Sequence, residues 1–294
     1  MAALDRDGVA LAYQQMGVGP DVVLVHGLAS NRAFWYASHA QWLVQAGYRV
    51  TLFDLRGHGY SGVSETGYSA TALAADLAHL IDTLELGPVL LMGHSYGGGV
   101  ALEYAAQHPH KIAGLALLDT RVNRLQPQQW LHEGPELSRL EQAVMRATPA
   151  EWEGETQVGL RYLEALARAT VAGVPLPSMG QWTPFGQGRG GLRSAKQFVR
   201  LLDMTEAQRE FVVMGATPAR LRSQLRQVPL LLAYGAQSRC LPSQLALAQL
   251  LPQAHCTQIA HAGHFFPATH PQATRERLQA WLRSLPGQLQ QVAS

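Results

Sequence analysis

The sequence predicts an α/β protein in which a doubly wound, mostly parallel β-sheet carries a mainly helical cap insertion. Short apolar runs that end in turn residues alternate with stretches of helical period, which is typical of a parallel sheet flanked by helices. The alternation stops at about residue 120 and resumes at about residue 217. A structureless loop of that length inside a compact domain is improbable, so we expect the intervening stretch to fold as helices of its own.

The individual elements follow in order along the chain. The opening "GVALAYQQMGVGP" predicts an antiparallel hairpin strand that leads into the sheet. Between the second and third buried strands, Ser69 or Thr71 can cap a helix that Gly87 and Pro88 end. Its apolar residues share one face: Leu73, Leu77, Leu80, Ile81 and Leu84. Six apolar runs predict buried strands at residues 22–27, 49–57, 88–95, 112–120, 228–235 and 255–264.

The domain boundaries follow from the interrupted alternation. Residues 1–119 and 217–288 are predicted to form the core, residues 120–216 the helical cap, and residues 289–294 a flexible tail. Within the cap, "GQGRGG" at residues 186–191 formally matches a dinucleotide-binding pattern. No strand precedes it and no βαβ unit surrounds it, so we interpret it as a loop.

Composition limits the classes of function. The chain has 294 residues, of which 47% are hydrophobic and 15% charged, and its formal net charge is only +2. With no polybasic run, we expect neither a nucleic-acid partner nor a membrane surface. Cys240 and Cys256 lack CxxC spacing and are expected to be reduced thiols. The start has no apolar signal region and no long apolar stretch follows, so a cytoplasmic protein is expected. Oligomeric state stays open.

The strongest motif is "GHSYGG", residues 93–98, directly after an apolar run and directly before a helical segment. In that context the pattern places Ser95 on a sharp turn from strand to helix, where its hydroxyl is exposed. The alternative is a serine that only caps a helix. Because strand, motif and helix all agree, we predict that Ser95 is a catalytic nucleophile.

Two further motifs complete a possible acyl-transfer site. "LVHGLAS" follows the first buried strand and predicts that the backbone N–H of Leu28 points at a developing oxyanion, together with the N–H of Tyr96. In "AHAGHFF", His264 follows the last strand and is the predicted general base, with His261 as the alternative. Two imidazoles without carboxylate or thiolate spacing make a weak metal site, so we expect no metal and no organic cofactor.

The motifs "HGLAS", "DLRGHGYS", "GHSYGGG" and "GHFF" occur in an order that resembles capped serine hydrolases of the α/β-hydrolase fold superfamily. The resemblance covers nearly the whole chain outside the cap. It implies that "DLRGHGYS", with Asp54 and Arg56, is a structural turn beside the pocket. It also argues against dehalogenases and epoxide hydrolases, because these use an aspartate nucleophile where this chain has Ser95.

The acid that orients the histidine is missing from the position where this family usually has it. The turn after "VPLLLAYG" carries Ser238 there, and residues 230–270 contain neither Asp nor Glu. Asp119, at the end of the preceding core strand, is the predicted replacement. The alternatives are a Ser–His dyad, a water held by Ser238, or a cap carboxylate such as Asp203 or Glu206.

These residues together predict a serine hydrolase that cleaves an ester, thioester or lactone, or a carbon–carbon bond next to a carbonyl, through an acyl-enzyme. Because the cap is rich in tryptophan and methionine, we expect an apolar acyl or aromatic small molecule as substrate. Two alternatives stay open. One is a lyase, cyclase or cofactor-free oxygenase on the same scaffold, and the other is a ligand-binding module with weak turnover.

Overall fold

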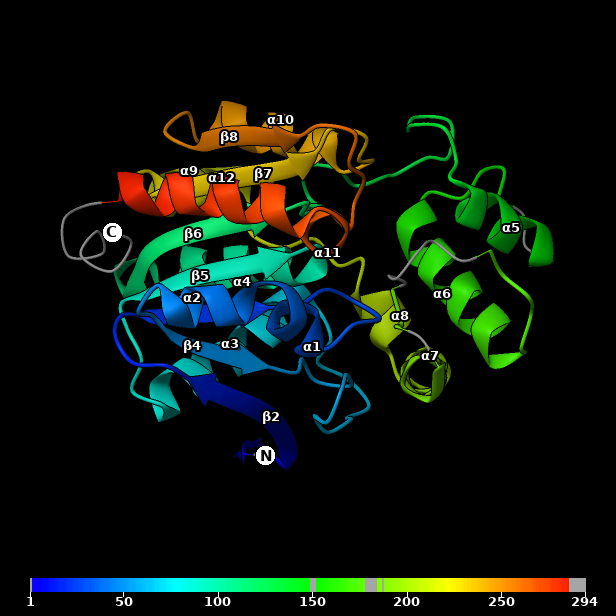
Figure 1. Cartoon of the computed structure of the whole chain (residues 1–294), viewed down its shortest axis with the longest axis horizontal. Coiled ribbons are helices and arrows are strands. Elements are labelled where there is room, and N and C mark those ends of the chain that lie inside the picture. Colours follow the sequence, from blue (N-terminus) through cyan, green and yellow to red (C-terminus); the bar gives the residue numbers. More distant parts are fainter. Residues whose placement is uncertain (1, 149–151, 178–183, 187, 286–294) are drawn as a thin grey trace.

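The computed structural model describes residues 2–148, 152–177, 184–186 and 188–285. An eight-stranded sheet forms the centre of the molecule, with strand order β1-β2-β4-β3-β5-β6-β7-β8 (Figure 1). The β1/β2 and β2/β4 pairs are antiparallel, and all other pairs are parallel. The predicted fold class and the predicted N-terminal hairpin are therefore confirmed. The predicted tail, residues 289–294, lies outside the described residues.

The strands lie where the apolar runs predicted them, although most are shorter than those runs. Their bounds are β1 Ala2–Arg6, β2 Val9–Met16, β3 Asp21–Val25, β4 Arg49–Phe53, β5 Val89–His94, β6 Ile112–Leu118, β7 Leu230–Gly235 and β8 His255–Ile259. Successive side chains of a strand point to opposite faces. Val23 and Val25 accordingly belong to one hydrophobic core and Val22 and Leu24 to the other. The central strands are apolar on both faces because both faces are covered.

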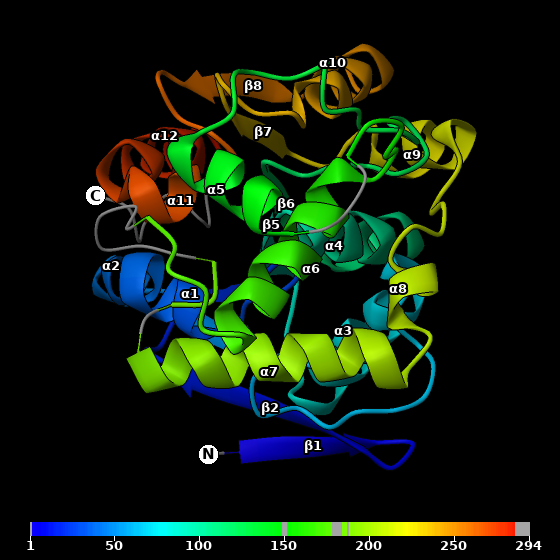
Figure 2. The same cartoon turned by 90° about the vertical axis from the view of Figure 1, so that its right-hand side faces the viewer.

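Helices cover both faces of the sheet (Figures 1 and 2). One core is closed by α3 (Ala70–Thr83), α4 (Tyr96–Gln107), α9 (Pro218–Leu225) and α10 (Leu241–Leu250). The other is closed by α1 (Ala33–Trp35), the π-helix η1 (Tyr36–Ala40), α2 (Gln41–Gln45), α11 (Phe266–Thr269) and α12 (Pro271–Ser284). A short 3-10 helix, η2 (Pro109–Lys111), precedes β6. Ser69 caps α3, since its hydroxyl accepts from the Ala72 N–H at 3.2 Å.

Four helices of the predicted cap region lie together at one side of the sheet, where α5, α6 and α7 cross in front of it in Figure 2. They are α5 (Arg139–Ala147), α6 (Val158–Val171), α7 (Gly188–Met204) and α8 (Ala207–Glu210). Their apolar faces form a third hydrophobic cluster, which includes Leu166, Phe198 and Leu201 and packs against Ala29 and Tyr68 of the core. The exact domain boundaries stay a prediction.

The prediction of a loop at residues 186–191 was wrong in its C-terminal part, because α7 begins at Gly188. Glycine lowers helix propensity by only about 1 kcal/mol per residue relative to alanine, so tertiary packing can outweigh it. Here Ala195, Phe198 and Leu202 bury one face of the helix. The helix therefore extends back through the glycines from a well-packed segment.

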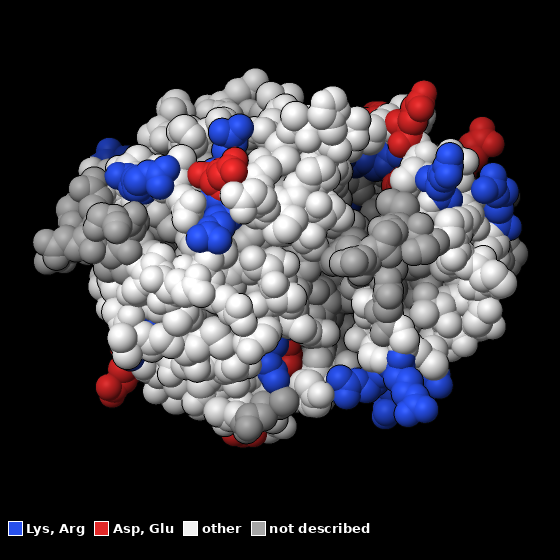
Figure 3. All heavy atoms as spheres, in the orientation of Figure 1, with Lys and Arg blue, Asp and Glu red and all other residues white. Residues whose placement is uncertain are grey.

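The opposite, exposed face of α7 carries basic residues that are spaced apart in the sequence. Its exposed basic residues recur every three or four positions: Arg189, Arg193, Lys196 and Arg200. This spacing places them on one face of the helix, and basic side chains gather at the lower edge of the cap in Figure 3. Within the described part of the chain, no helix is both long and apolar enough to cross a bilayer.

Candidate active site

Ser95 occupies the turn between β5 and α4 with φ 55° and ψ −126°, a conformation that non-glycine residues rarely adopt. The turn is so tight that a Cβ on Gly97 would lie 2.2 Å from the carbonyl oxygen of His26. A Cβ on Gly27, in the neighbouring loop, would lie 2.8 Å from Ser95 Cβ. The glycines of both motifs are therefore required for the close approach of β3 and β5, which leaves the Ser95 hydroxyl at the end of the sheet.

A continuous hydrogen-bonded chain joins Ser95, His264 and Asp119. The Ser95 hydroxyl lies 2.8 Å from His264 Nε2, and His264 Nδ1 lies 2.8 Å from Asp119 Oδ1. With the ring protonated at Nδ1, the Ser95 Oγ–H donates to Nε2 and the Nδ1–H donates to the carboxylate. A serine hydroxyl, an imidazole and a carboxylate in this order have the geometry that nucleophilic catalysis requires.

Asp119 lies directly after β6 and is fully buried. Three donors converge on its carboxylate: Nδ1–H of His264, the Gly235 N–H at 2.8 Å, and the Ser238 hydroxyl. Ser238 Oγ in turn accepts from the Cys240 N–H at 3.0 Å. Ser238 therefore holds the carboxylate from the position where the family usually has its acid.

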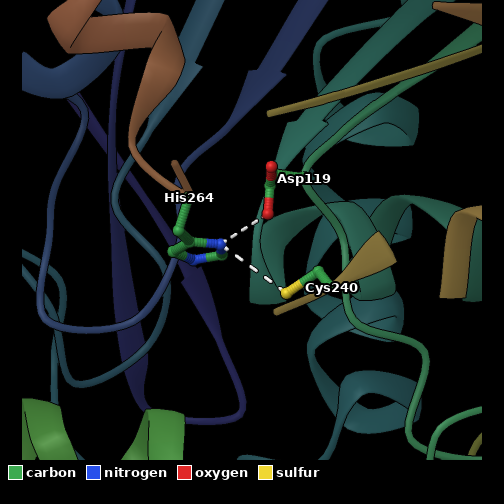
Figure 4. Close-up of side chains that lie close together, drawn as sticks. All are labelled: Asp119, Cys240 and His264. Carbon is green, nitrogen blue, oxygen red and sulfur yellow. Dashed lines mark hydrogen bonds and ion pairs between the residues drawn. The ribbon is translucent and has the colours of Figure 1, made fainter. Parts of the chain in front are cut away.

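The sulfur of Cys240 lies on the same edge of the imidazole, 3.7 Å from Nδ1 of His264 (Figure 4). Burial by itself lowers the pKa of His264. The Cys240 sulfur and the Asp119 carboxylate outweigh burial and raise the pKa from 6.5 to about 10. A ring with so high a pKa holds a proton on both nitrogens at neutral pH and must lose the one on Nε2 before it can act as a base.

The sequence indicated Cys240 only as a reduced thiol, and its contact with His264 was not predicted. A signal was available, because Cys240 follows the vacated acid position by two residues. Arg121 and Gln129, which line the same cavity, were missed as well. Both lie in the irregular segment after β6, where no motif marks a residue.

The loop that starts at Gly27 brings Leu28 beside Ser95, and both residues line one cavity with Tyr96. Neither the Leu28 N–H nor the Tyr96 N–H has a hydrogen-bond acceptor within the described part of the chain. His26 lies beneath this loop as a structural residue: Nδ1 donates to Gly27 O at 2.8 Å, and Nε2 accepts from the Leu55 N–H at 3.0 Å. Burial lowers the pKa of His26 to about 4, so its ring is neutral at physiological pH.

His94 supports the loop that carries His264. Its Nε2–H donates to the carbonyl oxygen of His264 at 2.9 Å, and its ring stacks on Phe34 with the ring centroids 4.7 Å apart. Burial lowers the pKa of His94 well below 6.5, and the nearby His264 ring lowers it further. His94 therefore stays a neutral donor that holds the His264 backbone in place.

In the part of the chain that the structure describes, neither the alternative acids nor the alternative base forms a hydrogen bond or ion pair with Ser95 or His264. Asp203 pairs with Arg168 and Glu206 pairs with Arg209. His261 lines the cavity with its backbone at φ 57°, but no hydrogen bond joins it to Ser95 among the described residues. In the "DLRGHGYS" turn, Asp54 accepts from the Arg32 N–H at 2.8 Å and the Tyr60 N–H at 3.0 Å, as a structural residue would.

A cavity of about 470 Å³ opens onto Ser95 and His264. Core loops and cap helices both line it, and its apolar lining residues include Leu28, Leu140, Val158, Leu160, Leu163 and Phe211. Two arginines also line it, but protein acceptors engage them. Arg121 donates to Gln126 O, Gln157 Oε1 and Pro127 O, and Arg239 donates to Leu131 O and Pro135 O. The cavity is therefore mostly apolar beside the serine.

The class of protein that this fold and site define is also the class that comparison with known proteins identifies. Residues 20–271 match the family model described as the alpha/beta hydrolase fold. The chain belongs to the α/β-hydrolase fold family, as the order of its motifs predicted.

Individual relatives are similar over part of the chain. The non-heme chloroperoxidase CPO-A1 of Kitasatospora aureofaciens is 40% identical over 103 residues, 35% of this chain and 37% of the relative. The 2-(acetamidomethylene)succinate hydrolase of Mesorhizobium japonicum is 34% identical over 118 residues, 40% of this chain and 41% of the relative. The matched segments thus span less than half of these relatives.

Among solved structures, Est816, described as an N-acyl homoserine lactone degrading enzyme, superposes with a TM-score of 0.67 at 22% identity. The match covers 95% of this chain and 99% of Est816. At this level of identity the likeness shows the shared fold.

Proposed function

We propose that the protein is a serine hydrolase that cleaves an ester, thioester or lactone of an apolar small molecule through a covalent acyl-enzyme. The observation that carries the proposal is the hydrogen-bonded chain from Ser95 Oγ through both nitrogens of His264 to Asp119. Hydrolase relatives and neighbours support the same class of chemistry.

In the first half-reaction, Ser95 Oγ attacks the carbonyl carbon of the substrate while its proton passes to His264 Nε2. The carbonyl π electrons move to the oxygen, and the unpaired N–H groups of Leu28 and Tyr96 stabilise that oxyanion. The oxyanion then collapses, the alcohol or thiol leaves with the proton from Nε2, and Ser95 remains acylated. Asp119 keeps the Nδ1–H oriented and stabilises the imidazolium ring throughout.

In the second half-reaction, His264 Nε2 removes a proton from water, and the hydroxide attacks the acyl carbon. Collapse returns the proton to Ser95 Oγ and releases the carboxylic acid. The cavity favours an uncharged acyl group, because the arginines that line it already donate to protein oxygens. Its volume of about 470 Å³ lies in the range of small-molecule sites.

Both cysteines are unpaired, which suits a reducing, cytoplasmic compartment.

A fluorophosphonate probe tests the covalent step directly. We expect wild-type protein to be labelled and Ser95→Ala to be unlabelled. Ser223→Ala, which changes an exposed serine on α9, is the matched control and should be labelled like wild type. Hydrolysis of short p-nitrophenyl esters and acyl thioesters should follow the same pattern. An unlabelled wild type, or equal labelling of Ser95→Ala, would overturn the proposal.

A further inference from the structure

Asp119, Cys240 and His264 form a cluster that the proposed hydrolysis uses only in part, since Cys240 takes no step in it. The carboxylate oxygen, the sulfur and the imidazole nitrogen of these residues all lie within 4.8 Å of one another. Figure 4 shows the three side chains converging from separate segments of the chain. Cys240 and His264 also line the cavity, so the cluster can be reached from it.

Two of the three separations are close to those that a tetrahedral zinc ion requires, and the third, between the Asp119 oxygen and the Cys240 sulfur, is at most 4.8 Å. Bonds of about 2.3 Å to sulfur and about 2.0–2.2 Å to nitrogen and oxygen place sulfur and nitrogen about 3.6 Å apart, and nitrogen and oxygen about 3.4 Å apart. The observed Sγ···Nδ1 distance is 3.7 Å and the Nδ1···Oδ1 distance is 2.8 Å. The Sγ···Nδ1 distance needs no change to fit a zinc ion. The Nδ1···Oδ1 distance needs to increase. His264 lies in a loop between β8 and α11 and has a partly exposed side chain.

We propose that this cluster is an inhibitory binding site for Zn²⁺ or a similar thiophilic divalent cation. Its ligands are Asp119 Oδ1, Cys240 Sγ and His264 Nδ1, with a water from the cavity completing a tetrahedron. One thiolate and one carboxylate balance the two charges of the ion. The set combines the sulfur, nitrogen and oxygen ligands that zinc prefers, unlike the His261–His264 pair considered from the sequence.

Occupancy of the site and catalysis exclude each other. When the metal binds Nδ1, the neutral ring carries its proton on Nε2, and the thiol proton is released to solvent. Nε2 then faces Ser95 as a donor and cannot accept the hydroxyl proton. The Asp119 carboxylate also loses its bond to the ring. This inhibitory consequence rests on the proposed function, whereas metal binding itself does not.

Cobalt(II) titration tests binding without any need for turnover. A cysteine ligand produces a thiolate-to-cobalt charge-transfer absorption in the near ultraviolet, which zinc then abolishes by displacement. We expect the band in wild type, in Ser95→Ala and in the matched control Cys256→Ser, which changes the exposed cysteine. Cys240→Ser and Cys240→Ala should each lose it while keeping the wild-type circular dichroism spectrum. A wild type without the band would overturn the proposal, as would a band that survives in both Cys240 variants.

Inhibition supplies the second readout. Zn²⁺ should inhibit ester hydrolysis by wild type and Cys256→Ser, and a chelator should restore the activity. Relative to its own uninhibited rate, Cys240→Ser should need at least about 10-fold more Zn²⁺ for the same inhibition. Equal sensitivity of the two cysteine variants would overturn the inhibitory role. If wild type hydrolyses no ester, the proposed function fails, and the cobalt band still decides the metal site.

Discussion

Replacement of Asp119 by asparagine tests the position of the catalytic acid. Asparagine has nearly the same shape but offers one oxygen and one NH2 group. The Gly235 N–H, a fixed backbone donor 2.8 Å from Oδ2, selects the amide oxygen on that side. The NH2 group then occupies the Oδ1 position and donates to His264 Nδ1. The ring is forced into the tautomer with its proton on Nε2, which faces Ser95.

The expected loss in kcat/KM is large because the wrong tautomer removes the base and the stabilising carboxylate together. A substitution of this kind in a Ser–His–Asp site costs about 10⁴-fold, equivalent to about 5.5 kcal/mol of activation free energy. Since Asp119 is fully buried, no solvent carboxylate can replace it. Asp203→Asn is the matched control. It alters a cap carboxylate paired with Arg168 and should change kcat/KM less than about twofold.

The assay is p-nitrophenyl ester hydrolysis with the wild type, Asp119→Asn, Asp203→Asn and the double variant Asp119→Asn/Ser238→Asp. In the double variant a carboxylate returns to the usual family position, beside the original one, because Ser238 Oγ contacts Asp119 Oδ1. We expect it to recover at least about tenfold of the lost rate. If Asp119→Asn keeps more than a tenth of wild-type activity, Asp119 is not the catalytic acid and the reasoning is wrong.

The remaining predictions concern the elbow and pH. Gly97→Ala should reduce ester hydrolysis at least about 100-fold, because the added Cβ would meet the carbonyl oxygen of His26. Gly99→Ala, whose Cβ would have nothing within 4 Å, should change the rate less than about twofold. Equal losses in the two variants would contradict this. The rate of hydrolysis should rise as the pH increases well above 6.5, because His264, with a pKa of about 10, must lose its proton before it acts. A rate that stays the same from pH 6 to pH 9 would argue against this. Burial lowers the pKa of three histidines from 6.5 to about 4: His26, His39 and His58. Between pH 6.5 and 4 the unfolded state binds protons at these rings that the folded state does not. The free energy of unfolding should therefore fall over this range by on the order of 3 kcal/mol per histidine. A urea midpoint that does not change between pH 6.5 and 4 would refute this.

The fold was predictable because its determinants are local. Alternating apolar runs and helical stretches require only the periods of strand and helix, and "GHSYGG" carries its own turn geometry. The start of α7 was not predictable in this way. Its glycines disfavour a helix locally, and burial of Phe198 and Leu202 against the rest of the cap overrides them.

The candidate site was predictable where a motif or an exclusion pointed to a residue. Asp119 emerged because residues 230–270 contain no carboxylate, and the structure brings it to His264. The contact between Cys240 and His264 depends on how the turns after β7 and β8 fold toward each other. That arrangement is set by tertiary packing, which no local pattern encodes.

The turn after β7 has a consequence for how the cap communicates with the core. Ser238 bonds to Asp119, while its neighbour Arg239 donates to the carbonyl oxygens of Leu131 and Pro135 at the entrance to the cap. Ser238 and Arg239 thus link the buried Asp119 carboxylate to residues 131–135, which lead into the cap helices above the cavity. A displacement of residues 131–135 would therefore act on the Asp119 carboxylate through the single peptide unit between Ser238 and Arg239.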